Sequence, residues 1–179
     1  MVYVALLRGI NVGGKNKIDM KQLKQAFEEA GMQDVVTYIN SGNIIFTSND
    51  QSKDQIAQTL ETAIHHHFGL HIKVLVLNRN DMDQIMQMLP DTWRNDDQMK
   101  GDVLFLWEHD ESVMANLPNK EGIDTVIYAP GAILWSVDKK NVTKSGISKL
   151  IGTKLYQQMT VRNVNTARKV YELMLRQSK

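Results

Sequence analysis

A hairpin between two helical segments is the feature of the first half that most constrains the fold of this chain. Residues 34–40 and 43–48 are rich in Val, Ile, Thr and aromatic residues and predict strands. Ser41-Gly42 between them is typical of a tight turn. Strands joined by so short a turn are antiparallel. The pattern therefore excludes an all-parallel sheet in this half.

Two more strands and two helices complete the first half. Residues 2–8 and 71–77 predict strands, while residues 19–31 and 52–69 predict helices. Asp19 with Gln22 and Ser52 with Gln55 have the spacing of capping residues at the two helix starts. Each helix ends at a glycine. The order is β-α-β-β-α-β, which is typical of a four-stranded antiparallel sheet with both helices on one face, the ferredoxin-like arrangement.

The second half repeats this element order without residue-level similarity. Pro130-Gly131 suits the middle of a type II turn and joins two of its predicted strands. We predict strands at 103–109, 123–129, 132–138 and 158–161, helices near 80–89, 110–116 and 145–157, and a final helix opening near Asn163 or Asn165. The predicted class is α+β, with two tandem ferredoxin-like α/β plaits and a C-terminal helix. The predicted domains are residues 1–78 and 79–179.

Composition and charge narrow the function classes. The 179 residues include no cysteine, which excludes disulfides and thiolate metal sites, and no apolar run is long enough to span a membrane. The start, MVYVALLRG, lacks the basic segment of a secretory signal, so we expect a cytoplasmic protein. Residues 79–138 have a net charge of −8 and residues 139–179 a net charge of +9. A basic tail of this kind either pairs with the acidic middle, faces water or binds an anion.

A loop rich in glycine and asparagine, Gly9–Asn16, follows the first strand. Its pattern G-x-x-x-x-G-K resembles the start of a phosphate-binding P-loop. An NTPase is not expected, because Asn16 stands where a hydroxyl would bind Mg²⁺ and because the next two strands are antiparallel. Two interpretations stay open: a loop whose backbone amides bind an anion, or a connection whose glycines adopt positive φ.

The segment 160–169, TVRNVNTARK, places amides and cations where a strand meets a helix. Its Asn and Thr residues are natural N-caps, whereas Arg162 and Arg168 are not required for capping. A helix start flanked by Arg is also a suitable anion site. The alternative is a structural role in which the arginines pair with the acidic middle region.

Other sites are less well supported. Three consecutive histidines, His65 to His67, lack the i, i+4 spacing of helical zinc ligands, so no metal site is predicted. An RNA-recognition sheet would need two aromatics in the third strand, which offers only Phe46. No residue pattern in the sequence points to a catalytic group, so enzymatic activity, any cofactor and the oligomeric state stay open.

Three segments together resemble a known family. YVALLRGINVGGKNKIDM, TYINSGNIIF and TVRNVNTARK are similar to the bacterial domain-of-unknown-function family numbered sixteen-ninety-seven. The resemblance implies a pair of ferredoxin-like plaits and transfers no catalytic residues. This chain departs from the family pattern at Val164, where many relatives have Trp. The signature polar positions fall on Arg8, Asn11, Gly13, Gly14, Asn16, Ser41, Gly42, Asn43, Arg162, Asn163, Asn165 and Thr166.

The first functional hypothesis is a protein that binds a small anionic or phosphorylated ligand where the glycine loop and the 160–169 segment meet in one cleft. The expected ligand-binding residues are Arg8, Asn11, Gly13, Gly14, Asn16, Asn43, Arg162, Asn163, Asn165 and Arg168. A second hypothesis is nucleic-acid binding by the basic tail through Lys139, Lys140, Lys144, Lys149, Lys154, Arg162, Arg168 and Lys169. A third is a protein-interaction module with an exposed sheet or acidic face.

Overall fold

The computed structural model describes residues 1–49 and 52–179 and divides into two compact units. Unit 1 comprises Met1–Asn80 together with Val170–Lys179, and unit 2 comprises Asp81–Lys169. The sequence-based boundary after residue 78 lies close to the first division. It assigned the whole C-terminal helix to the second half, however, whereas the last ten residues belong with unit 1.

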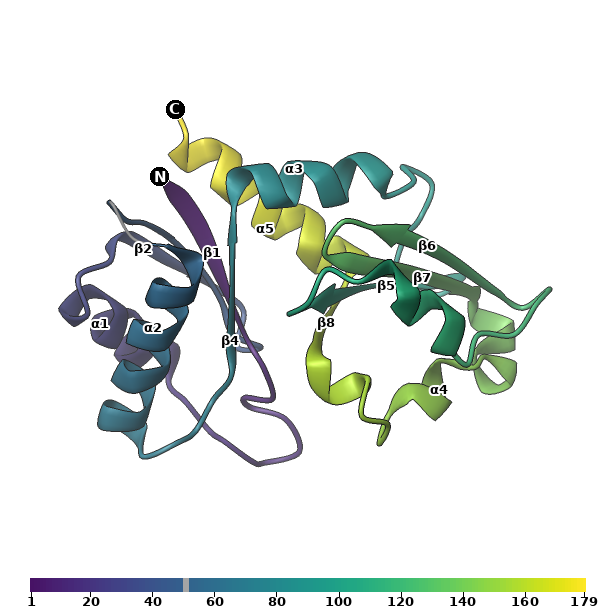
Figure 1. Ribbon diagram of the computed structural model, residues 1–179, viewed down its shortest axis with the longest axis horizontal. Coiled ribbons are helices and arrows are strands. Elements are labelled where there is room, and N and C mark those ends of the chain that lie inside the picture. The colour runs from purple at the N-terminus through teal and green to yellow at the C-terminus, as the bar shows by residue number, and fades with distance from the viewer. Residues whose placement is uncertain (50–51) are drawn as a thin grey trace. The chain divides into compact units, whose positions relative to one another are not determined.

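Unit 1 contains a four-stranded antiparallel sheet (Figure 1). Its strands are β1 (Val2–Leu7), β2 (Gln33–Tyr38), β3 (Asn43–Thr47) and β4 (Val74–Asn78), in the order β2-β3-β1-β4. Strands β2 and β3 are the predicted hairpin, which is confirmed. Strand β1 lies between β3 and β4 and is buried along its whole length.

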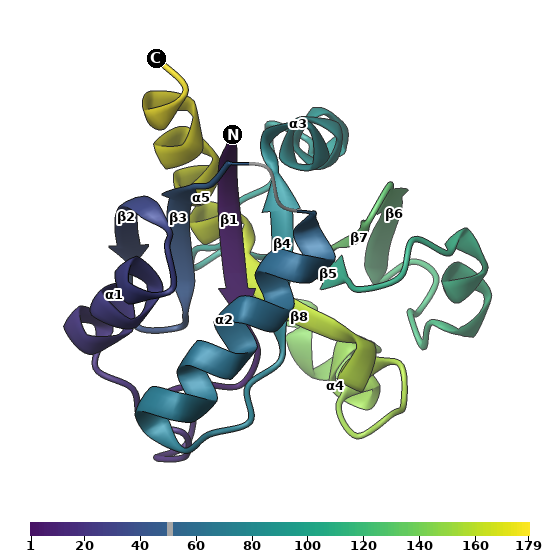
Figure 2. The ribbon, with the colours of Figure 1, turned by 60° about the vertical axis from the view of Figure 1, so that its left-hand side comes forward.

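Helices α1 (Met20–Glu29) and α2 (Lys53–Phe68) cover one face of this sheet (Figure 2). The Asp19 side chain caps α1, and Ser52 forms a capping box with Gln55 at the start of α2, as predicted. The apolar side chains of both helices pack on those of the strands. This core includes Tyr3, Leu7, Leu23, Phe27, Ile44, Phe46, Ile56, Leu60, Ile64 and Val76.

Unit 2 contains a second four-stranded antiparallel sheet. Its strands are β5 (Met99–Leu106), β6 (Asp124–Ala129), β7 (Ala132–Asp138) and β8 (Met159–Asn163), in the order β6-β7-β5-β8. The strand predicted over 103–109 is β5, which begins four residues earlier and ends three residues earlier than predicted. The charged residues around Gly101 suggest a loop, yet they pair with β7, and the Lys100 ammonium lies 2.5 Å from the Asp102 carboxylate.

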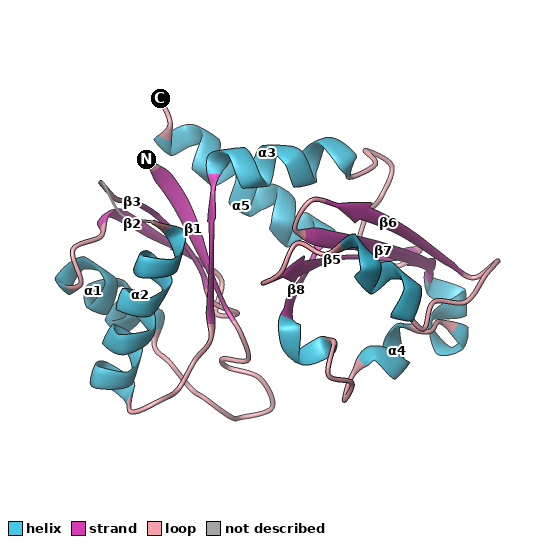
Figure 3. Cartoon of the chain, viewed as in Figure 1, coloured by secondary structure: helices cyan, strands magenta, loops and turns pink. Residues whose placement is uncertain are grey.

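The helices that connect the strands of this sheet are short, although a long one was predicted over residues 145–157 (Figure 3). They are η1 (Glu111–Asn116), η2 (Lys139–Lys144), α4 (Ile147–Leu150) and η3 (Tyr156–Gln158). The predicted helix over 145–157 was therefore wrong except for α4. Gly146 lies against the Pro118 backbone so closely that a Cβ would come within 1.8 Å of the Pro118 oxygen. Gly152 has φ +89°, which a helix does not allow.

Two longer helices complete the chain. Helix α3 (Arg79–Met88) follows β4 directly, and α5 (Val164–Gln177) follows β8. The predicted start of the last helix near Asn163 or Asn165 is confirmed. Across the residues that the structure describes, we find no helix with the length and apolar character needed to span a membrane.

Candidate functional site

The predicted ligand-binding residues lie in both units. Unit 1 contains Arg8, Asn11, Gly13, Gly14, Asn16 and Asn43, and unit 2 contains Arg162, Asn163, Asn165 and Arg168.

Two asparagine side chains hold the glycine loop, Gly9–Asn16, in its shape. The Asn11 amide accepts a hydrogen bond from Ile18 N at 2.9 Å and donates to Ile18 O at 3.1 Å and Asn40 O at 2.7 Å. The Asn16 amide donates to Gly9 O at 2.9 Å, and Asn11 N donates to Asn16 O at 3.1 Å. Both asparagines have positive φ, near 50°. They therefore shape the loop, and their amides are occupied by backbone groups.

The tip of this loop presents backbone amides to solvent. Gly13 and Gly14 are exposed and have φ values of 59° and 75°, a region in which an L side chain is strained. Among the residues that the structure describes, no hydrogen-bond acceptor is assigned to either amide. The side chains of Lys15 and Lys17 are exposed on either side of Asn16. The tip thus offers two uncommitted donors close to two cations.

A hollow of about 420 Å³ lies beside the loop. Its lining includes Asn11, Gly14, Lys17, Asp19 and Asn40. One oxygen of the Asp19 carboxylate already accepts hydrogen bonds from Lys21 N at 2.9 Å and Gln22 N at 3.0 Å. Sequence reasoning missed Lys17 and Asn40. Lys17 stands two residues beyond the G-x-x-x-x-G-K pattern and could have been included, whereas Asn40 reaches the hollow only through tertiary structure.

Asn43 and Arg8 occupy different positions in unit 1. Asn43 is fully buried, and its amide donates to Tyr38 O at 3.1 Å and to Ser41 Oγ at 3.0 Å. The expectation that Asn43 contacts a ligand is corrected accordingly, because solvent does not reach it. Arg8 is half-buried at the end of β1, and its backbone N donates to Lys73 O at 3.0 Å.

Arg162 lies inside unit 2. Only 7% of the residue is exposed, and one guanidinium nitrogen donates to Thr160 Oγ1 and Val161 O, both at 2.9 Å. Burial lowers the pKa of Arg162 to about 10, so the side chain stays protonated at neutral pH. One guanidinium nitrogen is thus engaged by groups of its own strand, and the expectation that Arg162 contacts a ligand or a phosphate backbone stays a prediction.

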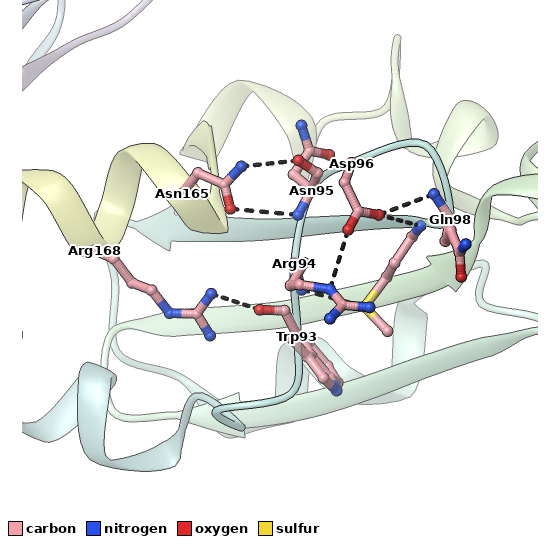
Figure 4. Close-up of polar contacts among 8 residues, drawn as sticks. Trp93, Arg94, Asn95, Asp96, Gln98, Asn165 and Arg168 are labelled. Carbon is pink, nitrogen blue, oxygen red and sulfur yellow. Dashed lines mark hydrogen bonds and ion pairs between the residues drawn. The ribbon is translucent and has the colours of Figure 1, made fainter.

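The other polar residues of the 160–169 segment fasten helix α5 to the chain before β5 (Figure 4). Arg168 donates to Trp93 O at 2.5 Å and to Pro90 O at 2.9 Å. Asn165 donates to Asn95 O at 2.8 Å and accepts from Asn95 N at 3.4 Å. Two backbone carbonyl groups therefore accept hydrogen bonds from the Arg168 guanidinium, and the expectation that Arg168 binds an anion stays a prediction.

Asn163 has a capping role at the start of α5. Its side-chain oxygen accepts a hydrogen bond from Thr166 N at 2.9 Å, the geometry of an N-cap. This contact is the structural alternative that the sequence analysis left open for the asparagines of the segment. The Asn163 oxygen is therefore engaged in the cap, while the expectation that this side chain orients a ligand stays a prediction.

Metal-ligating side chains do not gather in the described part of the chain. In 1–49 and 52–179, no three His, Cys, Asp or Glu side chains are grouped so that they could hold a metal ion. His65 and His71 stack with ring centroids 4.2 Å apart, and His67 Nε2 lies 3.1 Å from a Glu29 carboxylate oxygen. These histidines pack at the C-terminal end of α2.

Comparison with known proteins identifies the family. A family model described as "Protein of unknown function (DUF1697)" matches residues 1–135. Among solved structures, the chain is similar to the conserved bacterial protein SP0830 from Streptococcus pneumoniae, with 32% sequence identity and a TM-score of 0.83. That match covers 97% of this chain and 98% of the other. No curated protein matches it. The chain belongs to the DUF1697 family of conserved bacterial proteins, and the first two of its three signature segments lie within the matched residues.

Proposed function

We propose that the glycine loop of unit 1 binds a small anion, with phosphate-bearing molecules as the expected class. The observation that carries this proposal is the exposed tip, where the uncommitted amides of Gly13 and Gly14 adjoin Lys15 and Lys17. Backbone amides and lysine ammonium groups are the donors with which proteins commonly hold phosphate.

Preorganisation supports the proposal. The side chains of Asn11 and Asn16 fix the loop through hydrogen bonds to Gly9, Ile18 and Asn40, so less conformational entropy is lost when a ligand binds. The hollow of about 420 Å³ beside Gly14 and Lys17 provides room for a ligand larger than phosphate itself. The negative Asp19 at its rim makes the charge of Lys17 necessary for anion binding.

Isothermal titration calorimetry with inorganic pyrophosphate tests the proposal. The variant Lys17→Met removes a cation that lines the hollow, and Lys21→Met is its matched control because Lys21 is exposed on α1 and does not line it. A charge-assisted contact contributes about 1.5–3 kcal/mol, so Kd should rise about tenfold or more in Lys17→Met. Lys21→Met should bind within about twofold of the wild type. No binding by the wild type, or equal weakening in both variants, would reject the proposal.

A second candidate function rests on the lysines of residues 139–149. Lys139, Lys140, Lys144 and Lys149 are exposed, and none has an ion pair among the described residues. Such a cluster would contact the phosphates of a nucleic acid. Lys154 and Lys169 lie outside this stretch of the chain, Arg162 is buried, and Arg168 donates to Pro90 O, so the four lysines are the first to test. Binding of single-stranded DNA should weaken with a log–log salt slope of about 0.7 per contact. Equal binding after all four lysines are changed to Gln would exclude this candidate.

We also infer that each unit is a ferredoxin-like plait. The strand orders β2-β3-β1-β4 and β6-β7-β5-β8 are equivalent, which supports the inference. In unit 2 the two crossover helices are reduced to short helical turns. A crystal structure in which β5–β8 and η1 do not superpose on β1–β4 and α1 would oppose it.

A further inference from the structure

Unit 2 contains a cavity that the sequence analysis did not anticipate. It has a volume of about 250 Å³ and lies where η1 and the chain just before β8 flank the end of β5. Leu106, Val113 and Leu155 supply an apolar lining. Pockets for drug-sized ligands occupy roughly 300–1,000 Å³, so this one suits a smaller molecule.

Polar side chains of opposite charge also line this cavity. Glu108 and Lys154 contribute a carboxylate and an ammonium group, and Asn116 and Gln158 contribute amides. Among the residues that the structure describes, none of these four side chains has an assigned hydrogen bond or ion pair. Asp110 differs, because its carboxylate accepts a hydrogen bond from Ser112 N at 2.9 Å.

The charges select the class of ligand. Glu108 and Lys154 line one cavity without forming an ion pair with each other, so their two charges are both available to a molecule between them. An ammonium group would pair with Glu108 and a carboxylate with Lys154, while the apolar lining would contact a hydrocarbon side chain. A ligand with only one charge would leave the opposite protein charge unpaired and partly desolvated.

We propose that this cavity is a binding site for a small zwitterion, a free α-amino acid or a molecule of the same charge pattern. Asn116 and Gln158 supply further hydrogen bonds to its carboxylate or side chain. The proposal is independent of the glycine loop, because every residue that lines the cavity belongs to unit 2.

Calorimetric titration of the full chain tests this site. The probes are L-leucine and L-glutamine, and the controls are 3-methylbutylamine and 4-methylpentanoate, which each keep one charge of leucine. We expect at least one of the amino acids to bind, and each single-charge analogue to bind about tenfold more weakly, the loss for one charge-assisted contact. Equal binding of an analogue, or no binding of either amino acid, would overturn the proposal.

Matched variants locate the binding. Glu108→Gln and Lys154→Met should each raise the Kd about tenfold. Glu111→Gln and Lys120→Met remove the same charges from exposed positions outside the cavity and should leave the Kd within about twofold. Because all four positions are exposed, the variants should fold, which thermal melting would verify. An equal rise of the Kd in the cavity variants and in their controls would show that the amino acid binds elsewhere, which would overturn the proposal.

Discussion

The carboxylate of Asp124 joins three segments of unit 2. One oxygen accepts from Lys120 N at 2.9 Å and Gly146 N at 2.8 Å. The other accepts from Trp135 Nε1 at 3.1 Å and from the hydroxyl of buried Ser145 at 2.5 Å. These bonds hold the loops before β6 and after η2 against β7. The residue is therefore a structural centre of unit 2.

Asp124→Asn should destabilise the protein by about 2 kcal/mol. An amide has only one accepting oxygen, so the substitution leaves donors of the network unsatisfied, and bonds to a charged acceptor are each worth about 1.5–3 kcal/mol. Urea unfolding would measure the loss. Asp97→Asn is the control, because Asp97 is exposed, and its free energy of unfolding should change by less than about 0.5 kcal/mol. Equal stability of the two variants would show that the network is not needed.

Acid should weaken the same network. Partial burial raises the pKa of Asp124, but the hydrogen bonds from Ser145, Gly146, Lys120 and Trp135 together lower it below its usual value. The stabilisation is therefore complete above the unfolded pKa of about 3.9 and is lost as the pH falls through the folded pKa. As the pH falls below the unfolded value of about 3.9, the wild type should progressively lose its stability advantage over Asp124→Asn. A difference that does not depend on pH would contradict this assignment.

The site could be predicted only in part at the level of single residues. The composition of the glycine loop and the capping character of Asn163 were visible in the sequence, because both depend on neighbours along the chain. The partners of Asn11 and Arg168 were not visible. Asn40 and Trp93 lie 29 and 75 residues away along the chain, and which carbonyl meets which side chain depends on tertiary packing.

Helix α2 shows how local signals determine an element. Ser52 accepts from Gln55 N at 3.2 Å, the Gln55 side chain accepts from Ser52 N at 3.3 Å, and Gly69 ends the helix in the left-handed conformation. Ser52→Ala should lower the free energy of unfolding by about 1 kcal/mol. Ser148→Ala, at an exposed position, should change it by less than about 0.5 kcal/mol. Chemical denaturation would measure the free energy of unfolding of both variants. An unchanged value for Ser52→Ala would contradict the capping role.

Elements with strong local signals were predicted well, and elements shaped by distant contacts were not. The hairpins at Ser41-Gly42 and Pro130-Gly131 are confirmed, because their turns and β-branched flanks are encoded side by side. The helix over 145–157 failed because the chain leaves the helical conformation after Leu150, where Ile151 is extended and Gly152 has φ +89°. Its apolar pattern instead serves the buried Leu150 and the partly buried Ile147 and Leu155, which pack on the sheet of unit 2.

Considered as a whole, the molecule is not a simple succession of two halves. Residues Val170–Lys179 return to unit 1, where Gln177 Nε2 donates to Asp34 O at 2.8 Å and the Arg79 guanidinium lies 6.0 Å from the centre of the Tyr171 ring. The end of the chain is therefore part of the first unit. Removal of Val170–Lys179 would therefore delete part of unit 1.

Met174→Ala should test this arrangement. Met174 is fully buried in the part of α5 that belongs to unit 1, and loss of such a side chain costs about 2–5 kcal/mol. Met88→Ala is the control, because Met88 is 45% exposed. This substitution should lower the free energy of unfolding by less than about 1 kcal/mol. Thermal or urea unfolding would compare them. A stable Met174→Ala would show that the last ten residues contribute little to the fold.

Amide NMR spectra recorded during titration with inorganic pyrophosphate test the central claim most directly. The account predicts saturable shifts of the Gly13 and Gly14 amides, together with their neighbours Lys15 and Lys17, and the loss of these shifts in Lys17→Met but not in Lys21→Met. Shifts confined to the lysines of residues 139–149, or no saturable shift at the glycine loop, would contradict it.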